Sequence, residues 1–275
     1  MHCCRCLLPA SQRNSEQRGD FVNPKITAWV TGAIVAVCFL ACIGNALRGQ
    51  TAVTPPDYEH NQPALLDAFR QVEVASVSDA MEQVLHEKRY LSHSMQAIFP
   101  AKFVGTALTV QLVKQENNDP HALDGMLAAI DSGHKDDVYV MQVEDGQDIA
   151  GMGGLMGTAM HSRGFAGAVI DGGVRDLPQL KRLGFPVYAT GVVPSTSVGH
   201  YRFGGANTPV RCDGVSVQPG DIISADQDGV VVIPRVRAVE ILERAQKLDY
   251  TEHAMYPVIE KLQSIVEAVK QFGRI

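Results

Sequence analysis

Cysteine is nearly absent from the main part of this sequence. Of the 6 cysteines, Cys212 is the only one that lies beyond residue 42. A single cysteine cannot form an internal disulfide, so the folded part of the chain must be held together without one. The N-terminal Cys3-Cys4-x-Cys6 has no second Cys/His pair nearby, which argues against a zinc site.

Positive charge is also scarce. The 275 residues include 24 Lys and Arg against 30 Asp and Glu, for a net charge of -6. A generic nucleic-acid-binding surface needs clustered Lys and Arg, so we predict no nucleic-acid partner. Internal repeats and low-complexity tracts are absent. The 45% hydrophobic content is ordinary for a globular protein and suits one domain with an N-terminal appendage.

Charge of either sign is missing from residues 26–47, which include Trp29, Val30 and Phe39. As a helix rising 1.5 Å per residue, this segment would be long enough to cross a hydrocarbon layer of about 30 Å. We therefore expect a transmembrane anchor or a secretory signal; a buried core helix is the alternative. The basic residues before it predict a cytoplasmic N-terminus and a main part that is membrane-anchored or exported to the far side.

The resulting domain plan has four parts. Residues 1–25 form a polar leader, 26–47 the hydrophobic segment, 48–62 a linker and 63–275 the folded domain. Within the domain, apolar periodicity predicts a helix that starts at 76–81 with Ser78 as its N-cap, and one that spans 236–272 with a break at Pro257. Further helices are predicted at 63–72, 122–130, 155–163 and 177–183, and strands at 103–113, 138–143, 166–170 and 187–190, with two more in 215–233. This alternation predicts an α/β fold with a mixed, barrel-like sheet.

A glycine-rich turn, Gly151-Met152-Gly153-Gly154-Leu155, stands between a predicted strand and a predicted helix. The first N–H groups of a helix are unpaired and carry partial positive charge, and glycines let an anion approach the main chain closely. The turn is thus suited to a carboxylate or phosphate, with a purely packing role as the alternative. Its spacing matches neither a dinucleotide fingerprint nor a P-loop.

A second motif is Asp171-Gly172-Gly173-Val174-Arg175-Asp176. We expect a buried strand to end at Asp171, the glycines to turn the chain, and the Arg-Asp pair to open a helix. Functional side chains concentrate where strands end in α/β folds. Arginine offers a planar fork to a carboxylate or enolate, and aspartate is a hard ligand for Mg²⁺. The alternative is an Asp176 that only satisfies the helix N-terminus and pairs with Arg175 on the surface.

Together with several other stretches, these motifs resemble the RraA-like family. That family includes class II pyruvate aldolases acting on 4-hydroxy-4-methyl-2-oxoglutarate and the regulator of RNase E activity. The resemblance covers about residues 76–234. In chain order it consists of VSDA at 77–80, GTALTV at 105–110, RGFAGAVIDGGVRD at 163–176, PV at 209–210, GVxVxPGD at 214–221 and ADxDGVVVIP at 225–234. So many matches in one order make the resemblance specific.

The resemblance implies a swivelling β/β/α domain with flanking helices that assembles as a homotrimer or hexamer, with active sites between subunits. It implies a divalent metal, Mg²⁺ or alternatively Mn²⁺, held by Asp176 largely through water. Arg175 would be the catalytic residue that binds the keto oxygen and stabilises an enolate. Backbone N–H groups of Gly153, Gly154 and Leu155 would hold the pyruvyl carboxylate.

The sequence departs from the family's aldolases at one position. They carry an acidic residue twenty-one positions before the arginine, and here that position is Gly154, which cannot do acid–base work. His200 is a candidate substitute because histidine titrates near neutral pH, with a structural role as the alternative.

The leading hypothesis is a divalent-metal-dependent carbon–carbon lyase on small 2-oxo acids, which would also decarboxylate oxaloacetate through the same enolate. The alternative is a non-catalytic trimeric regulator that binds an RNase-type protein. The family's demethylmenaquinone methyltransferase label is disfavoured, because the sequence has no S-adenosylmethionine-binding glycine loop with a ribose-binding acid.

Overall fold

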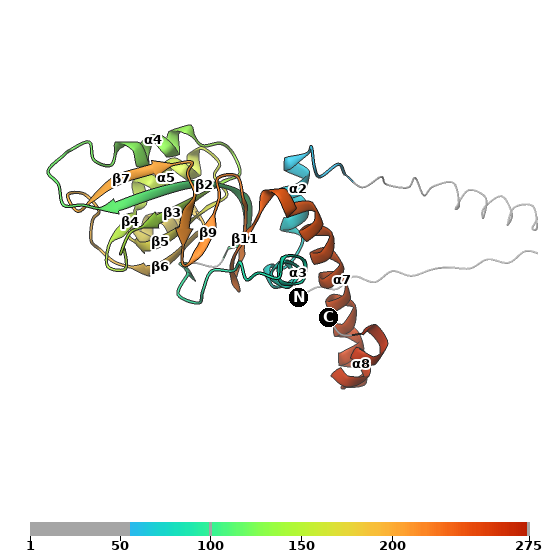
Figure 1. The fold of residues 1–275 in the computed structure, drawn as a ribbon. Coiled ribbons are helices and arrows are strands. Elements are labelled where there is room, and N and C mark those ends of the chain that lie inside the picture. Colours follow the sequence, from blue (N-terminus) through green and yellow to red (C-terminus); the bar gives the residue numbers. More distant parts are fainter. Residues whose placement is uncertain (1–55, 99–100, 274–275) are drawn as a thin grey trace, which may run out of the picture. The chain divides into compact units, whose positions relative to one another are not determined.

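The structure, a computed structural model, describes residues 56–98 and 101–273 (Figure 1). The polar leader and the hydrophobic segment at 26–47 lie outside these residues, so the domain plan stays a prediction there. The predicted localisation, anchored in or exported across a membrane, is corrected. No helix among the described residues is long and apolar enough to cross a membrane.

The described part has an α/β architecture. Its helices are α2 (Gln62–Arg70), α3 (Val74–Leu85), α4 (Asp124–Ser132), α5 (Gly154–Ser162), α6 (Leu177–Leu183), α7 (Ala238–Leu262) and α8 (Ile265–Phe272), with a 3-10 turn η1 (Arg235–Arg237). Its strands are β1 (Gln96–Ala97), β2 (Phe103–Lys114), β3 (Asp137–Val143), β4 (Ala150–Met152), β5 (Gly167–Val174), β6 (Val187–Val192), β7 (Tyr201–Ala206), β8 (Val210–Cys212), β9 (Val215–Val217), β10 (Ile222–Asp226) and β11 (Gly229–Ile233).

The main sheet is mixed and nearly closed, as predicted. Its order is β1-β6-β5-β3-β2-β10-β11, with β4 added beside β5 and β7 beside β2. The central strands β2, β3, β5 and β6 run parallel, whereas β10 and β11 are antiparallel. A bridge between Tyr90 and Val231 brings the chain just before β1 to the opposite edge strand. The sheet therefore curls into a barrel-like form.

Three hydrophobic clusters hold the layers together. One joins α4, α5 and α6 to one face of the central strands, through Tyr139, Met160 and Leu180 among others. A second packs α2, α3 and α7 on β10 and β11, and the third fills the barrel interior around Tyr188. Helices α4, α5 and α6 are thus packed on one face of the main sheet.

The glycines of the second motif do not turn the chain, contrary to the prediction. Strand β5 continues through them to Val174. A Cβ at Gly173 would lie 2.8 Å from the carbonyl oxygen of Ile149, and a Cβ at Gly172 would lie 2.9 Å from Val143. These glycines are therefore required by close packing against the neighbouring chain, which a turn signal in the sequence cannot reveal.

Two helix boundaries also differ from the predictions. Helix α3 begins at Val74, so Ser78 lies inside it; the N–H of Val74 donates to Asp226 Oδ2 at 3.0 Å, a partner 152 residues away. Helix α7 continues through Pro257 and stops at Gln263, which adopts a left-handed conformation. Ser264 then caps α8 by accepting from the N–H of Glu267.

Candidate active site

The two glycine-containing motifs become neighbours because β4 and β5 are adjacent parallel strands that end at the same edge of the sheet. Ala150 pairs with Gly173 and Met152 with Val174. Just beyond, the N–H of Arg175 donates to the carbonyl of Met152 at 3.1 Å. The carboxyl ends of parallel strands are where α/β folds place ligand sites. The sheet thus joins segments that lie more than twenty residues apart.

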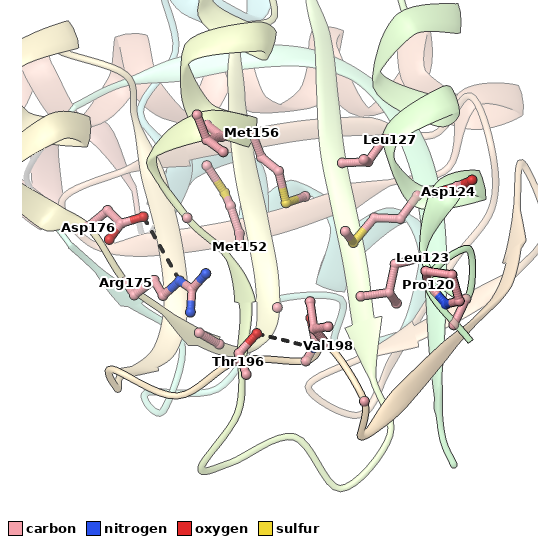
Figure 2. A pocket seen from close by; sticks show the side chains of 18 of the residues that line it. Pro120, Leu123, Asp124, Leu127, Met152, Met156, Arg175, Asp176, Thr196 and Val198 are labelled. Atoms are coloured by element: carbon pink, nitrogen blue, oxygen red, sulfur yellow. Dashed lines mark hydrogen bonds and ion pairs between the residues drawn. The ribbon is translucent and has the colours of Figure 1, made fainter. Parts of the chain in front are cut away.

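A cavity of about 290 Å³ opens at this edge. Figure 2 shows Arg175 and Asp176 on one side of it and residues of α4 on the other. The lining comes from the start of α4, the glycine turn and the first turn of α5, the Arg175-Asp176 pair, and the loop after β6. It comprises Asp119, Pro120, Ala122, Leu123, Asp124, Met126, Leu127, Ala150, Gly151, Met152, Gly153, Leu155, Met156, Arg175, Asp176, Thr196, Ser197, Val198 and Gly199.

Asp176 lies between the end of β5 and the start of α6, and its backbone conformation is strained. Its backbone is left-handed, with φ 60° and ψ 37°, a conformation that aspartate tolerates better than most residues. Its side chain does not cap α6, as the alternative reading expected. Instead, Oδ2 accepts a hydrogen bond of 2.9 Å from the N–H of Gly154 at the start of α5. The carboxylate is held at the pocket edge, with half of the side chain exposed.

Arg175 is oriented by the loop after β6. Its Nη1 donates to the carbonyl of Ser195 at 2.8 Å, and its Nε lies 3.9 Å from Asp176 Oδ2. Ser195 is itself fixed, because its hydroxyl donates to the carbonyl of Asp148 and accepts from the N–H of Ala150. The Arg175 side chain is 41% exposed, and its guanidinium keeps part of its donor edge free for a ligand.

The glycine turn presents free main-chain donors. In the part of the chain that the structure describes, the N–H groups of Gly153 and Leu155 have no hydrogen-bond acceptor, whereas that of Gly154 is taken by Asp176. Gly153 has an extended backbone that any residue can adopt, so space rather than conformation requires glycine there. A Cβ on it would lie 2.7 Å from Asp176 Oδ2.

A divalent metal fits the residues present only as an ion held mainly by water. No group of three or more His, Cys, Asp or Glu side chains within residues 56–98 and 101–273 is placed to share a metal. Asp176 offers a single carboxylate whose Oδ2 is already engaged with Gly154. Mg²⁺ commonly keeps several waters and binds one or two carboxylates together with a substrate oxygen.

The space around Gly154 is already filled. A Cβ there would lie 3.0 Å from Gln179 Cγ and 3.1 Å from Asp176 Cβ. Gln179 is held in place, because its Nε2 donates to Thr158 Oγ1 at 2.9 Å. The methylene groups of Gln179 therefore occupy the space beside residue 154.

The structure does not bring His200 to Arg175. His200 lines a separate polar hollow beside Lys114 and Tyr201, and its Nδ1 lies 2.9 Å from Glu116 Oε1. The pocket beside Arg175 is lined by Gly199, the residue before His200, but not by His200 itself.

Sequence reasoning missed the α4 wall and the loop at 195–198. The loop follows a predicted strand at the functional edge, which is a usable signal. The α4 residues resemble any apolar helix face, so the sequence carried no signal for them.

Comparisons with known proteins identify the family. The sequence profile of the RraA-like family, described as Aldolase/RraA, matches residues 74–232. The chain belongs to the RraA-like family. A Halalkalibacterium halodurans protein, provisionally named a 4-hydroxy-4-methyl-2-oxoglutarate aldolase, is 30% identical over 192 residues, which cover 68% of this chain and 84% of that protein.

Two solved structures share the RraA-like fold. An uncharacterised protein from Pseudomonas syringae has a TM-score of 0.70 and 26% identity, covering 80% of this chain and 100% of its own. Streptomyces coelicolor RraAS2, titled an unusual member of the RNase ES inhibitor RraA protein family, has a TM-score of 0.62 and 29% identity, covering 73% of this chain and 96% of its own. The family thus contains proteins named as aldolases and proteins named as RNase inhibitors.

Proposed function

We propose that this RraA-like protein is a divalent-metal-dependent carbon–carbon lyase that acts on pyruvyl substrates, in the manner of 4-hydroxy-4-methyl-2-oxoglutarate aldolases and with oxaloacetate decarboxylation. The observation that carries the proposal is the arrangement of Arg175 and Asp176 beside the free N–H groups of Gly153 and Leu155 in one pocket. Arg175 and the two N–H groups are donors for a keto oxygen and a carboxylate at neighbouring positions, and Asp176 offers its carboxylate beside them.

In this proposal the free N–H groups hold the carboxylate of a 2-oxo acid at the start of α5. Arg175, fixed by the Ser195 carbonyl, donates to the keto oxygen. The bond between C3 and C4 breaks, and its electron pair forms the pyruvate enolate, whose charge Arg175 stabilises. In 4-hydroxy-4-methyl-2-oxoglutarate the C4 hydroxyl loses its proton and C4 leaves as the keto carbon of a second pyruvate, whereas oxaloacetate loses C4 as carbon dioxide. The enolate then takes a proton at C3 and leaves as pyruvate.

Asp176 is the residue that would hold the metal, Mg²⁺ or Mn²⁺, through water. When bound, the ion supplies Lewis-acid neutralisation of the charge that develops on the keto oxygen. The hydrogen bond from Gly154 keeps the carboxylate at the pocket edge. With glycine at 154, the chain itself offers no acid–base group at that point, so oxaloacetate, which loses carbon dioxide without needing a base, is the simplest test substrate.

We also propose that the domain self-associates as a homotrimer or hexamer. Leu155, Leu127 and Val198 at the pocket mouth are 89%, 49% and 65% exposed. Apolar side chains gathered on one surface commonly mark an interface. Their position would place the pocket at a subunit boundary.

The proposal is tested by coupled pyruvate release from oxaloacetate and 4-hydroxy-4-methyl-2-oxoglutarate with the full-length protein. We expect release with Mg²⁺ and its loss in EDTA. Arg175→Ala should lower kcat by about 10²–10³-fold, the size of a lost oxyanion donor. Arg175→Lys should rescue little, because a point charge lacks the planar fork.

Arg211→Ala, an exposed arginine that does not line the pocket, is the matched control and should stay near wild type. The lyase proposal would be abandoned if neither substrate yields pyruvate above the Arg175→Ala level. Binding to an RNase-type protein without turnover would then favour the regulator.

A further inference from the structure

Arg175 follows directly after β5, which lies between β4 and β6 at the edge of the sheet that holds the candidate site. On one side, the N–H of Arg175 donates to the carbonyl of Met152 at the end of β4, at 3.1 Å. On the other side, the N–H of Val193, the first residue after β6, donates to the carbonyl of Val174 at 3.0 Å. Main-chain bonds therefore tie β5 to each neighbour just where the arginine side chain begins.

The side chain of Ser195 joins those two neighbours to each other. Its hydroxyl donates to the carbonyl of Asp148 at 2.9 Å, just before β4, and accepts from the N–H of Ala150 at 3.0 Å, in β4. The carbonyl of the same serine accepts from Arg175 Nη1 at 2.8 Å. Figure 2 shows Arg175 beside Thr196, the next residue of this loop. One serine thus anchors the loop and presents the acceptor that directs the guanidinium.

A hydroxyl suits this junction because a single oxygen donates one hydrogen bond and accepts another. Alanine at 195 would leave the Asp148 carbonyl and the Ala150 N–H without this partner. The loop would then lose its tie to β4, and the carbonyl that receives Arg175 would be free to shift. All of these bonds lie within one protomer, so they do not depend on how the chain assembles.

We infer that Ser195 is a positioning residue for Arg175. Its hydroxyl holds the loop after β6 against β4, so that its carbonyl sets the direction of the guanidinium toward the keto oxygen. The inference rests on the proposed lyase function. A misdirected Arg175 loses most where the enolate charge develops, because donors aimed at that charge act mainly in the transition state. Both substrates carry the keto oxygen that Arg175 meets, so Ser195 should affect both equally.

Ser195→Ala tests the hydroxyl in the full-length protein with Mg²⁺. The kcat for pyruvate release should fall by about tenfold to a hundredfold with either substrate, as when a reacting group is misplaced by up to about 1 Å. KM should change by less than about threefold, because the N–H groups of Gly153 and Leu155 hold the substrate carboxylate without Ser195. Ser195→Thr keeps the hydroxyl and should restore kcat to within about threefold of wild type.

Ser162→Ala is the matched control. It also removes a hydroxyl that donates to a main-chain carbonyl, that of Thr158 at 2.8 Å, but at an exposed position that does not line the pocket. It should keep the wild-type kcat. If Ser195→Ala does not fold, Ser195→Cys, whose thiol is a weak donor, replaces it in every comparison.

A double-mutant cycle shows whether Ser195 acts through Arg175. In the Arg175→Ala background, Ser195→Ala should lower kcat by less than about twofold, because no guanidinium is left to direct. Phenylglyoxal, which modifies arginine, gives a readout that needs no turnover. Peptide mass spectrometry should show Arg175 reacting about twofold to tenfold faster in Ser195→Ala than in wild type or Ser162→Ala, the factor that one ordinary hydrogen bond represents.

Failure of the inference and failure of the lyase proposal are distinguishable. A wild-type kcat in Ser195→Ala, no recovery in Ser195→Thr, or equal losses with and without Arg175 would each overturn the inference, while pyruvate release still supports the lyase. If wild type releases no pyruvate from either substrate, the lyase proposal fails and the phenylglyoxal rates decide. Faster reaction of Arg175 in Ser195→Ala then supports the positioning role, and an unchanged or slower rate overturns it.

Discussion

The Arg175-Asp176 pair leaves no room for a side chain at Gly153. A Cβ there would lie 2.7 Å from Asp176 Oδ2 and 3.3 Å from Arg175 Nε. Gly153→Ala should therefore displace the pair and lower kcat/KM for pyruvate release by about tenfold to a hundredfold, the usual cost of misplacing a reacting group. The fold should persist, since the Gly153 backbone is extended.

Gly191→Ala is the control for that variant, because a Cβ there meets nothing within 4 Å. It should keep wild-type kinetics. Equal activity of Gly153→Ala and wild type would mean that the contact with Asp176 has no part in turnover.

The Asp171 carboxyl has a raised pKa because the side chain is partly buried. Desolvation raises the pKa of its carboxyl above the ordinary 3.8, and the nearby Asp213 charge adds to this, while the Asp213 N–H bond opposes it. The folded chain thus holds this proton to higher pH than the unfolded chain. The contribution of the protonated Asp171 carboxyl to the free energy of unfolding is fully present below about pH 3.8. It is lost as the pH rises through the folded-state pKa.

Asp171→Asn removes that titration and can still accept from the N–H of Asp213. We expect the free energy of unfolding of the variant, minus that of wild type, to grow as pH rises from below 3.8 toward neutrality. Urea denaturation across this range measures it, with the exposed Asp131→Asn as control. A difference that is flat or shrinks with pH would contradict the assignment.

At the scale of elements, α5 and α6 approach closely at Gly157. A Cβ there would lie 2.2 Å from Leu180 Cδ2, and Leu180 is fully buried. Alanine favours a helix by about 1 kcal/mol over glycine, yet overpacking costs about 1–3 kcal/mol. We therefore expect Gly157→Ala to destabilise the protein by up to about 2 kcal/mol in urea denaturation.

A double-mutant cycle isolates this contact. Leu180→Ala alone should cost about 2–5 kcal/mol by leaving a cavity. The double variant should cost less than the sum of the two, because the added methyl then meets no side chain at 180. Simple additivity would show that α5 and α6 relax apart.

At the scale of the whole molecule, Leu155 is the most informative surface residue. It is 89% exposed although it is a leucine beside the pocket. Under the proposed trimer or hexamer, Leu155→Glu should lower the mass measured by sedimentation and reduce pyruvate release. Val236→Glu, at a position 90% exposed in η1, should change neither. A wild-type monomer would rule out the assembly.

Most elements of the domain could be predicted from the sequence because their apolar residues repeat with helical or strand periodicity, as in α6 and β3. Periodicity is a local signal, and the errors arose where distant groups decide. The start of α3 depends on Asp226, and the continuation of β5 through Gly172 and Gly173 depends on β4 and the loop before it. No pattern within either segment records those partners.

For the site, the sequence by itself determined the family and the two motifs, because the residues at 163–176 and their order are specific. Only the tertiary structure decided that Asp176 hydrogen-bonds to Gly154, that the Ser195 carbonyl orients Arg175, and that α4 closes the pocket with leucines. It also separated His200 from the pocket. The physical reason is that these contacts join distant segments that strand pairing and helix packing bring together. The sequence gives the chemistry of each side chain but not which distant groups it will meet.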